Sequence, residues 1–131
     1  MLFHHLGIFV KSIDKSNIIF SRDLKAQKTS EVIVDNDLGV KVQFFKDVNG
    51  ITYELVEGLG KKNPVKNTLE QNKNILNHVA YTTKQFDNQL EELNSYGYIK
   101  ISDICKSVAF NGNRIVFLLS PLNFIIELIE N

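Results

Sequence analysis

The run Ile126-Glu127-Leu128-Ile129-Glu130, which decides the fold, has a counterpart at Tyr53-Glu54-Leu55-Val56-Glu57 in the first half of the chain. In both runs an acid takes the second position, where a half-buried strand normally carries an apolar side chain. Two matched runs of this unusual kind indicate an internal duplication, which has to be recognised before any other feature is interpreted.

Each of these runs follows a histidine at the same spacing. His5 precedes Glu54 by 54 − 5 = 49 positions, and His78 precedes Glu127 by 127 − 78 = 49 positions. The local sequences agree as well, since each histidine is followed by a branched residue and then by a very small one. The duplication therefore relates four side chains that are able to bind a metal ion.

Composition limits the classes of function. The chain has 131 residues, 44% of them hydrophobic, which is enough for one packed domain or for two small modules that share a core. Its 15 basic and 15 acidic residues cancel, so we expect no nucleic-acid partner. No apolar run approaches the roughly 20 residues that span a bilayer, and no signal peptide is recognisable. We expect a cytoplasmic protein without a membrane partner, in which the single Cys105 forms no internal disulfide.

The first half predicts a strand, a short helix and three further strands. Alternation over residues 3–10 places His5, Gly7 and Phe9 on one face of the first strand. Ser12 is a suitable N-cap for the helix that follows. The remaining strands are expected at 30–34, 40–45 and 51–56.

The second half predicts the same order of elements. A strand at 78–82 precedes a helix that carries Phe86, Leu90 and Leu93 at i, i+4 and i+7. Thr83 is the expected cap at the start of this helix, and Gly97 follows its end. The remaining strands are expected at 98–104, 115–119 and 124–129.

These patterns predict an α+β fold in which each half is a βαβββ module. The expected single domain, 1–131, consists of a first module at 1–60, a connector at 61–77 and a second module at 78–131. One helical turn is expected in the connector, around residues 65–71. Because one module alone would expose an apolar face of its sheet, the two should pair as a curved, mostly antiparallel eight-stranded sheet around a metal cleft.

The two histidines and two glutamates predict a metal centre. Glu127 lies between Ile125 and Ile129 on its face of the last strand, and burying a carboxylate in such surroundings is costly unless a cation compensates it. Two imidazoles and two carboxylates suit one divalent ion of intermediate softness, such as nickel, cobalt, zinc, manganese or ferrous iron. The expected ligands are His5, Glu54, His78 and Glu127.

With these four residues on paired βαβββ modules, the sequence resembles the vicinal oxygen chelate superfamily, also called the glyoxalase/bleomycin-resistance fold, over essentially its whole length. The resemblance implies paired βαβββ modules with one metal ligand on each of four equivalent strands. Within the superfamily, the chain looks most like methylmalonyl-CoA epimerases. The residues that carry this second likeness are Ser30-Glu31-Val32, the run from Asp37 to Val42, and Asn63-Pro64-Val65 with Leu69.

The resemblance implies an isomerase or lyase that removes and returns a proton beside a metal-bound carbonyl, through an enediolate. Its substrate would be a small carbonyl compound or a thioester. Glu127 is the expected ligand and proton shuttle. For an epimerase, a second acid must act on the opposite face of the substrate, and Asp37 is the first candidate, ahead of Glu31.

Three alternatives stay open. Glyoxalase I, lactoylglutathione lyase, would use the same four ligands on a thiol hemithioacetal. A ferrous dioxygenase of this fold typically binds its iron through two histidines and one carboxylate. The additional carboxylate of Glu54 argues against this alternative. A non-enzymatic small-molecule binding protein of the same fold would generally lack the full ligand set. For any of them we expect a homodimer, because dimerisation commonly covers sheet edges and apolar helix faces.

Overall fold

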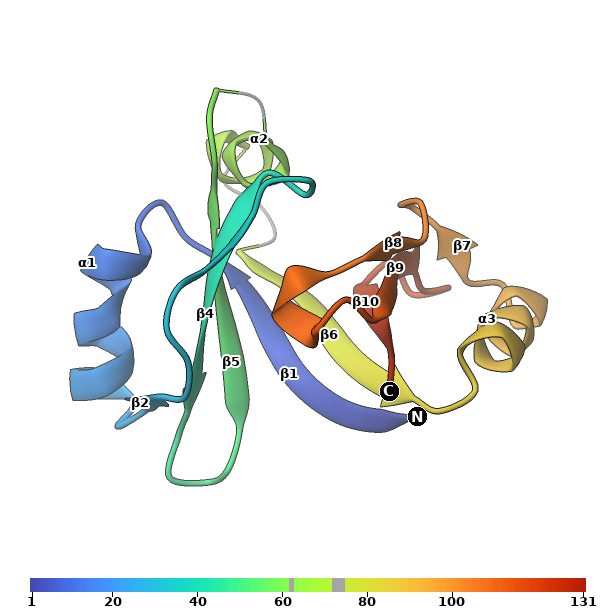
Figure 1. Cartoon of the computed structure of the whole chain (residues 1–131), viewed down its shortest axis with the longest axis horizontal. Coiled ribbons are helices and arrows are strands. Elements are labelled where there is room, and N and C mark those ends of the chain that lie inside the picture. The colour runs from blue at the N-terminus through green and yellow to red at the C-terminus, as the bar shows by residue number, and fades with distance from the viewer. Residues whose placement is uncertain (62, 72–74) are drawn as a thin grey trace. The chain divides into compact units, whose positions relative to one another are not determined.

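The computed structural model describes residues 1–61, 63–71 and 75–131. Residues 62 and 72–74 of the expected connector lie outside the described residues. Figure 1 labels the helices and strands. In chain order they are β1 (Leu2–Phe9), α1 (Ile13–Ile18), η1 (Ile19–Asp23), β2 (Gln27–Lys28), β3 (Ile33–Asp35), β4 (Val40–Lys46), β5 (Thr52–Gly58), α2 (Pro64–Glu70), β6 (Leu76–Thr83), α3 (Phe86–Ser95), β7 (Ile99–Lys100), β8 (Cys105–Lys106), η2 (Val108–Phe110), β9 (Arg114–Leu119) and β10 (Ile125–Glu130).

The predicted α+β fold is confirmed as a mixed, mostly antiparallel sheet with helices. Eight strands follow the order β2-β4-β5-β1-β6-β10-β9-β7, while the short β3 and β8 pair with β4 and β9. The parallel pairs with a described register are β1 with β5 and β6 with β10. None of the described helices is long and apolar enough to cross a membrane.

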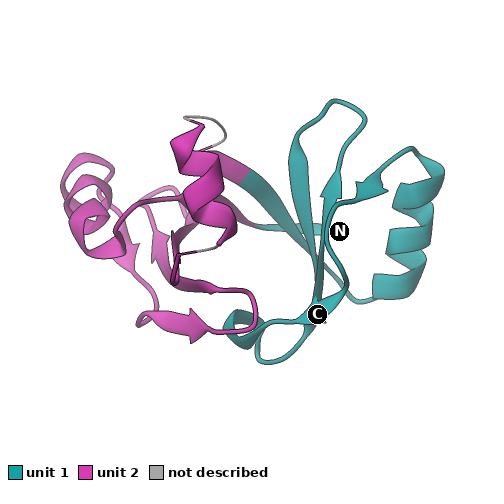
Figure 2. Cartoon of the chain, turned by 90° about the horizontal axis from the view of Figure 1, so that it is seen from above, with its two compact units in different colours: residues 1–4, 78–131 teal, residues 5–77 magenta. Residues whose placement is uncertain are grey.

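The chain divides into two compact units, which are coloured separately in Figure 2. Unit 2 comprises residues 5–77, and unit 1 comprises residues 1–4 and 78–131. In unit 2, β5 pairs with β1 on one side and with β4 on the other. In unit 1, β10 likewise lies between β6 and β9. Each unit therefore places one strand between a parallel and an antiparallel neighbour.

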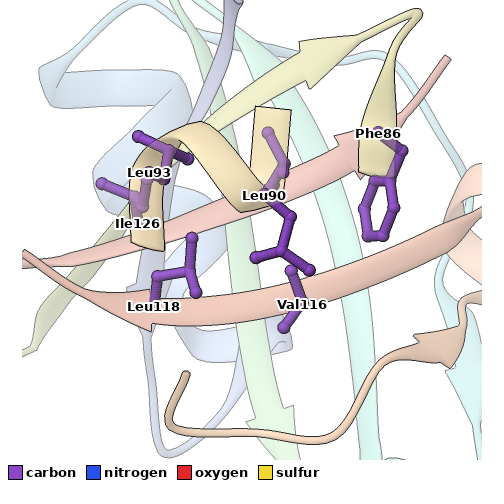
Figure 3. Packing of buried hydrophobic residues seen from close by; sticks show 7 residues of the cluster. Phe86, Leu90, Leu93, Val116, Leu118 and Ile126 are labelled. Atoms are coloured by element: carbon purple, nitrogen blue, oxygen red, sulfur yellow. The ribbon is translucent and has the colours of Figure 1, made fainter. Parts of the chain in front are cut away.

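Each unit has its own hydrophobic core, between a helix and one face of its strands. In unit 1, the apolar side chains of α3 pack on those of β9 and β10, as Figure 3 shows. The members of this core are Phe86, Leu90, Leu93, Val116, Leu118, Ile126 and Leu128. In unit 2, the corresponding core consists of Ile13, Phe20, Ala26, Phe45 and Leu55. The predicted apolar stripe of the second helix is thus the surface that α3 buries.

The hydrogen bonds of the hairpin turns repeat with an offset of 73 positions. The Asp47 carboxylate accepts from the backbone N–H groups of Asn49 and Ile51, at 2.9 and 3.0 Å. The Ser120 hydroxyl accepts from those of Leu122 and Phe124, both at 3.2 Å. Since 120 − 47, 122 − 49 and 124 − 51 all equal 73, the duplication extends to the turns as well as the strands.

The outermost predicted strands, 30–34 and 98–104, are wrong in extent. The structure has β2 and β3 around the first of these ranges, and β7 and β8 around the second. A serine interrupts the ladder in each unit. The Ser30 hydroxyl accepts from Phe44 N at 3.0 Å, and the Ser102 hydroxyl accepts from Phe117 N at 2.9 Å. A side-chain oxygen thus replaces the backbone carbonyl that would have continued the strand.

The ends of the helices agree in part with the prediction. Ser12 caps α1, and its side chain accepts from Lys15 N. Thr83 does not occupy the N-cap of α3, which is Gln85, but its hydroxyl accepts from Gln85 N at 3.2 Å. Gly97 follows the C-cap of α3 with φ +94°, a conformation that favours glycine.

Candidate metal centre

The first histidine and glutamate meet within unit 2. His5 lies on β1 and Glu54 on β5, and the parallel register of the two strands pairs Gly7 with Glu54. His5 Nε2 lies 3.6 Å from Glu54 Oε1. His5 has no exposed surface, and Glu54 is 5% exposed. Two ionisable side chains are therefore withdrawn from water at one point of this strand pair.

The second pair meets in the same way within unit 1. His78 lies on β6 and Glu127 on β10, where the parallel register pairs Ala80 with Glu127. His78 Nε2 lies 3.3 Å from Glu127 Oε2, and the two residues are only 4% and 2% exposed. In each unit the glutamate is thus opposite the residue two positions after the histidine, so the duplicated spacing becomes a duplicated contact.

An aromatic ring accompanies each pair. Phe44 is the cross-strand partner of Glu54 on β4, and its ring is 5.6 Å from that of His5 at an interplanar angle of 78°. Phe117 is the partner of Glu127 on β9, and its ring is 5.3 Å from that of His78, again at 78°. Edge-to-face contacts of this kind restrict the orientation of an imidazole.

A second acid on each glutamate-bearing strand has a different role. Glu57 accepts a hydrogen bond of 2.8 Å from Ile13 N at the start of α1, and it forms an ion pair of 2.9 Å with Lys41. Glu130 forms an ion pair of 2.8 Å with Arg114, which also holds Asp87 near the start of α3. Both acids stand three positions after the buried glutamate. Glu57 connects β5 to the start of α1, and Glu130 connects β10, through Arg114, to the start of α3.

The donor set fits a divalent metal ion. His5 and Glu54 are buried in unit 2, and His78 and Glu127 are buried in unit 1, so each unit offers one imidazole and one carboxylate as possible ligands of a divalent ion. Burial of two carboxylates is costly without a compensating cation, and imidazole with carboxylate suits the divalent ions of the first transition row. The group thus meets the chemical requirement of such an ion.

The predicted second acids occupy a different environment. Asp37 is exposed in the turn between β3 and β4, and Glu31 is exposed before β3. The neighbouring Asp35 is buried and accepts from Leu38 N at 3.0 Å, which shapes this turn. His4 stacks edge-on against Phe110 in unit 1, in keeping with a structural role. The catalytic role of Asp37 stays a prediction.

Sequence reasoning missed the aromatic partners, and it matched the outer acids Glu57 and Glu130 without recognising their role. A constant offset was the signal available, because 117 − 44, 130 − 57 and 114 − 41 all equal 73, as does 78 − 5. The phenylalanines at 44 and 117 could have been found by extending the alignment of the two halves beyond the glutamate runs. Their contacts with the histidines and with the helix starts required the structure.

A family model matches most of the chain. The model of the Glyoxalase/Bleomycin resistance protein/Dioxygenase superfamily matches residues 4–117. The chain belongs to this superfamily. The resemblance stated from the sequence is thereby confirmed. Among curated proteins, none matches the sequence.

Solved structures share the fold of this superfamily member at low sequence identity. A hypothetical protein from Bacillus halodurans C-125 is 22% identical with a TM-score of 0.85, and the match covers 98% of this chain and 93% of that one. Methylmalonyl-CoA epimerase from Mycobacterium tuberculosis is 19% identical with a TM-score of 0.81, covering 98% and 86%. The Streptomyces coelicolor methylmalonyl-CoA epimerase in complex with 2-nitronate-propionyl-CoA has the same identity and TM-score, covering 100% and 97%. These matches establish a common fold.

Proposed function

We propose that His5, Glu54, His78 and Glu127 together bind one divalent metal ion, and that the protein is an epimerase-like enzyme acting on an acyl thioester. The observation that carries the proposal is the duplication of a buried histidine–glutamate contact, at 3.6 Å in one unit and 3.3 Å in the other. The full-length likeness to methylmalonyl-CoA epimerases supports the choice of substrate class.

The chemistry to be assisted is removal of a weakly acidic proton beside a carbonyl. A divalent ion supplies Lewis acidity, which stabilises negative charge that develops on the carbonyl oxygen. Glu127 is the proposed base on one face of the substrate, where it accepts the proton. Asp37 is the proposed acid on the opposite face, and delivery of a proton from that side inverts the carbon centre. Its exposure keeps it in exchange with solvent protons.

Metal content is the first test of this proposal. Untagged protein is dialysed against mixed divalent ions and analysed by plasma mass spectrometry, with Glu127→Gln and the matched variant Glu130→Gln. The wild type and Glu130→Gln should each retain about one ion per chain, and Glu127→Gln should lose it. Glu130 stands on the same strand but binds Arg114, so its variant controls for damage to β10. A wild type without bound metal would contradict the proposal.

Isotope exchange tests the reaction. Methylmalonyl-CoA of one configuration is incubated with the metal-loaded protein in D2O, and deuterium at the α-carbon and configuration are followed separately. The wild type should incorporate deuterium at the α-carbon and invert its configuration. The Asp37→Asn variant should still incorporate deuterium at the α-carbon through Glu127. It should invert the configuration at least about tenfold more slowly than the wild type, and its metal content should be unchanged. Turnover of a hemithioacetal, without exchange of the thioester, would instead assign glyoxalase I chemistry.

A further inference from the structure

A pocket in unit 2 lies outside the histidine–glutamate contact. Its volume is about 430 Å³, and it opens where β1 and β5 end and α2 begins. The residues that line it are Val10, Lys11, Gly58, Gly60, Asn63, Val65, Lys66, Leu69 and Glu70. They come from the two residues after β1, from the end of β5 with the turn that follows it, and from α2 with its N-cap. The pocket is therefore a feature of unit 2 alone.

The wall that α2 contributes is held by internal hydrogen bonds. The buried Asn63 side chain caps α2, since its Oδ1 accepts from Lys66 N at 2.8 Å and its Nδ2 donates to Gly60 O at 3.1 Å. This side chain packs against Gly58 so closely that an added Cβ at position 58 would overlap Asn63 Oδ1. The start of α2 is thus fixed against the end of β5 before any ligand binds.

The lining combines positive charge with an apolar surface. Lys11 and Lys66 provide two cations, and Glu70, which lies 3.8 Å from Lys66 across one turn of α2, provides one anion. Val10, Val65 and Leu69 supply the apolar part. A ligand with a strongly anionic end on a flexible, partly apolar arm matches this lining, because lysine binds phosphate as a point charge.

The strands relate the pocket to the proposed metal ligands of the same unit. β1 and β5 are parallel, and both run toward the pocket. Val10 is five positions beyond His5, and Gly58 is four positions beyond Glu54. At a rise of roughly 3.3 Å per residue, the pocket begins about 13 to 17 Å along the strands from the histidine–glutamate contact. Only an elongated substrate can reach from this pocket to the contact between His5 and Glu54.

We propose that this pocket binds the phosphate-bearing end of the acyl thioester, while the reacting carbonyl lies at the histidine–glutamate contacts. This inference rests on the proposed function for the identity of the substrate. It adds Lys11 and Lys66 as residues that select a phosphorylated carrier over a short thioester. Glu70 moderates their charge.

Calorimetric titration tests the pocket without measuring turnover. Acetyl-CoA is the phosphorylated probe, and S-acetyl-N-acetylcysteamine is the short thioester without phosphate. The variants are Lys11→Met with Lys66→Met, and Glu70→Gln. Lys46→Met, an exposed lysine of β4 that does not line the pocket, is the matched control. Metal content is measured on every sample.

The double lysine variant should bind acetyl-CoA about fivefold to tenfold more weakly, and Glu70→Gln should bind it more tightly. Lys46→Met should bind acetyl-CoA as tightly as the wild type does. No variant should change the affinity for the short thioester or the metal content. Affinity for acetyl-CoA should fall with added salt, since exposed charges are screened. Equal acetyl-CoA affinity in the wild type and the double lysine variant would overturn the inference. Pyrophosphate binding as tightly as acetyl-CoA would also overturn it, by reducing the pocket to an anion site. Lysine-dependent binding to a metal-free protein would refute only the proposed reaction.

Discussion

The ring of Phe44 stands edge-on to the imidazole of His5, with the centroids 5.6 Å apart, and the unit 1 counterpart repeats the contact at 5.3 Å. Each phenylalanine is also the cross-strand neighbour of the glutamate in its unit. An aromatic residue thus limits the movement of both proposed ligands. It makes the conformation of the imidazole a property of the fold, present before a metal ion arrives.

Replacement of Phe44 or Phe117 by Leu should weaken metal binding. An aromatic pair contributes about 0.5 to 1.5 kcal/mol beyond burial, which corresponds to roughly a twofold to tenfold rise in the dissociation constant. Competition titration with a chromophoric chelator measures it. Phe45→Leu, next along β4 but in the core beneath α1, should lower thermal stability and leave the affinity of the folded protein unchanged. If the Phe44→Leu and Phe117→Leu variants both bind the metal ion as tightly as the wild type, the two rings only fill space.

The cluster around Arg114 should make unit 1 sensitive to acid. Hydrogen bonds from Arg114 lower the pKa of Glu130 and of Asp87 from their ordinary values. A carboxylate whose pKa is lower in the folded state stabilises it above the unfolded pKa, and this contribution is lost as the pH falls through the folded value. Unfolding free energy should therefore decrease below about pH 4.5, less steeply in Arg114→Met. Urea titrations between about pH 3 and 7 compare the slopes. Identical slopes would contradict the argument.

The turn residues Asp47 and Ser120 should be partly interchangeable. Both accept two backbone N–H bonds at equivalent positions. Asp47→Ser should therefore unfold close to the wild-type temperature, and Asp47→Ala should unfold clearly lower, because only alanine leaves the two N–H groups without their acceptor. Thermal melts by circular dichroism decide. If serine is as damaging as alanine, the equivalence of the turns is false.

Leu118→Ala should test the core shown in Figure 3. Leu118 has no exposed surface, and removing such a side chain costs about 2 to 5 kcal/mol of unfolding free energy. Leu122→Ala, at a side chain that is 83% exposed, should stay within roughly 0.5 kcal/mol of the wild type. Chemical denaturation of the three proteins gives both differences. A small loss at Leu118 would mean that α3 is not packed on the sheet as described.

The duplication made much of the fold predictable. Period-two alternation placed His5, Gly7 and Phe9 on one face of their strand, which the structure buries, and helical spacing found Phe86, Leu90 and Leu93. Equal spacing brought histidine and glutamate together in each half. These successes share a cause, since they follow from local periodicity and from one repeated distance. The roles of the four residues, the identity of the metal ion, the cytoplasmic location and the homodimer stay predictions.

The failures have a common physical origin. Ser30 and Ser102 end their strands through hydroxyls that bond a neighbouring strand, and nothing within each segment distinguishes such a serine from an ordinary strand residue. The contacts of the outer acids Glu57 and Glu130, likewise, are evident only once the structure has placed the backbones of Ile13 and Arg114 beside them. In each case a single side chain contacts a backbone far away in sequence, which local patterns do not encode.

Gly58 is a means of sorting related sequences. Since the Asn63 side chain occupies the space in which a Cβ at position 58 would lie, a relative with a larger residue there has to place the side chain at position 63 elsewhere and lose this cap of α2. Glycine at this position together with asparagine five residues later is therefore a sequence marker for the connector geometry described above. Relatives that keep the histidine–glutamate pairs but lack this marker would share the proposed metal ligands without sharing the pocket beside α2.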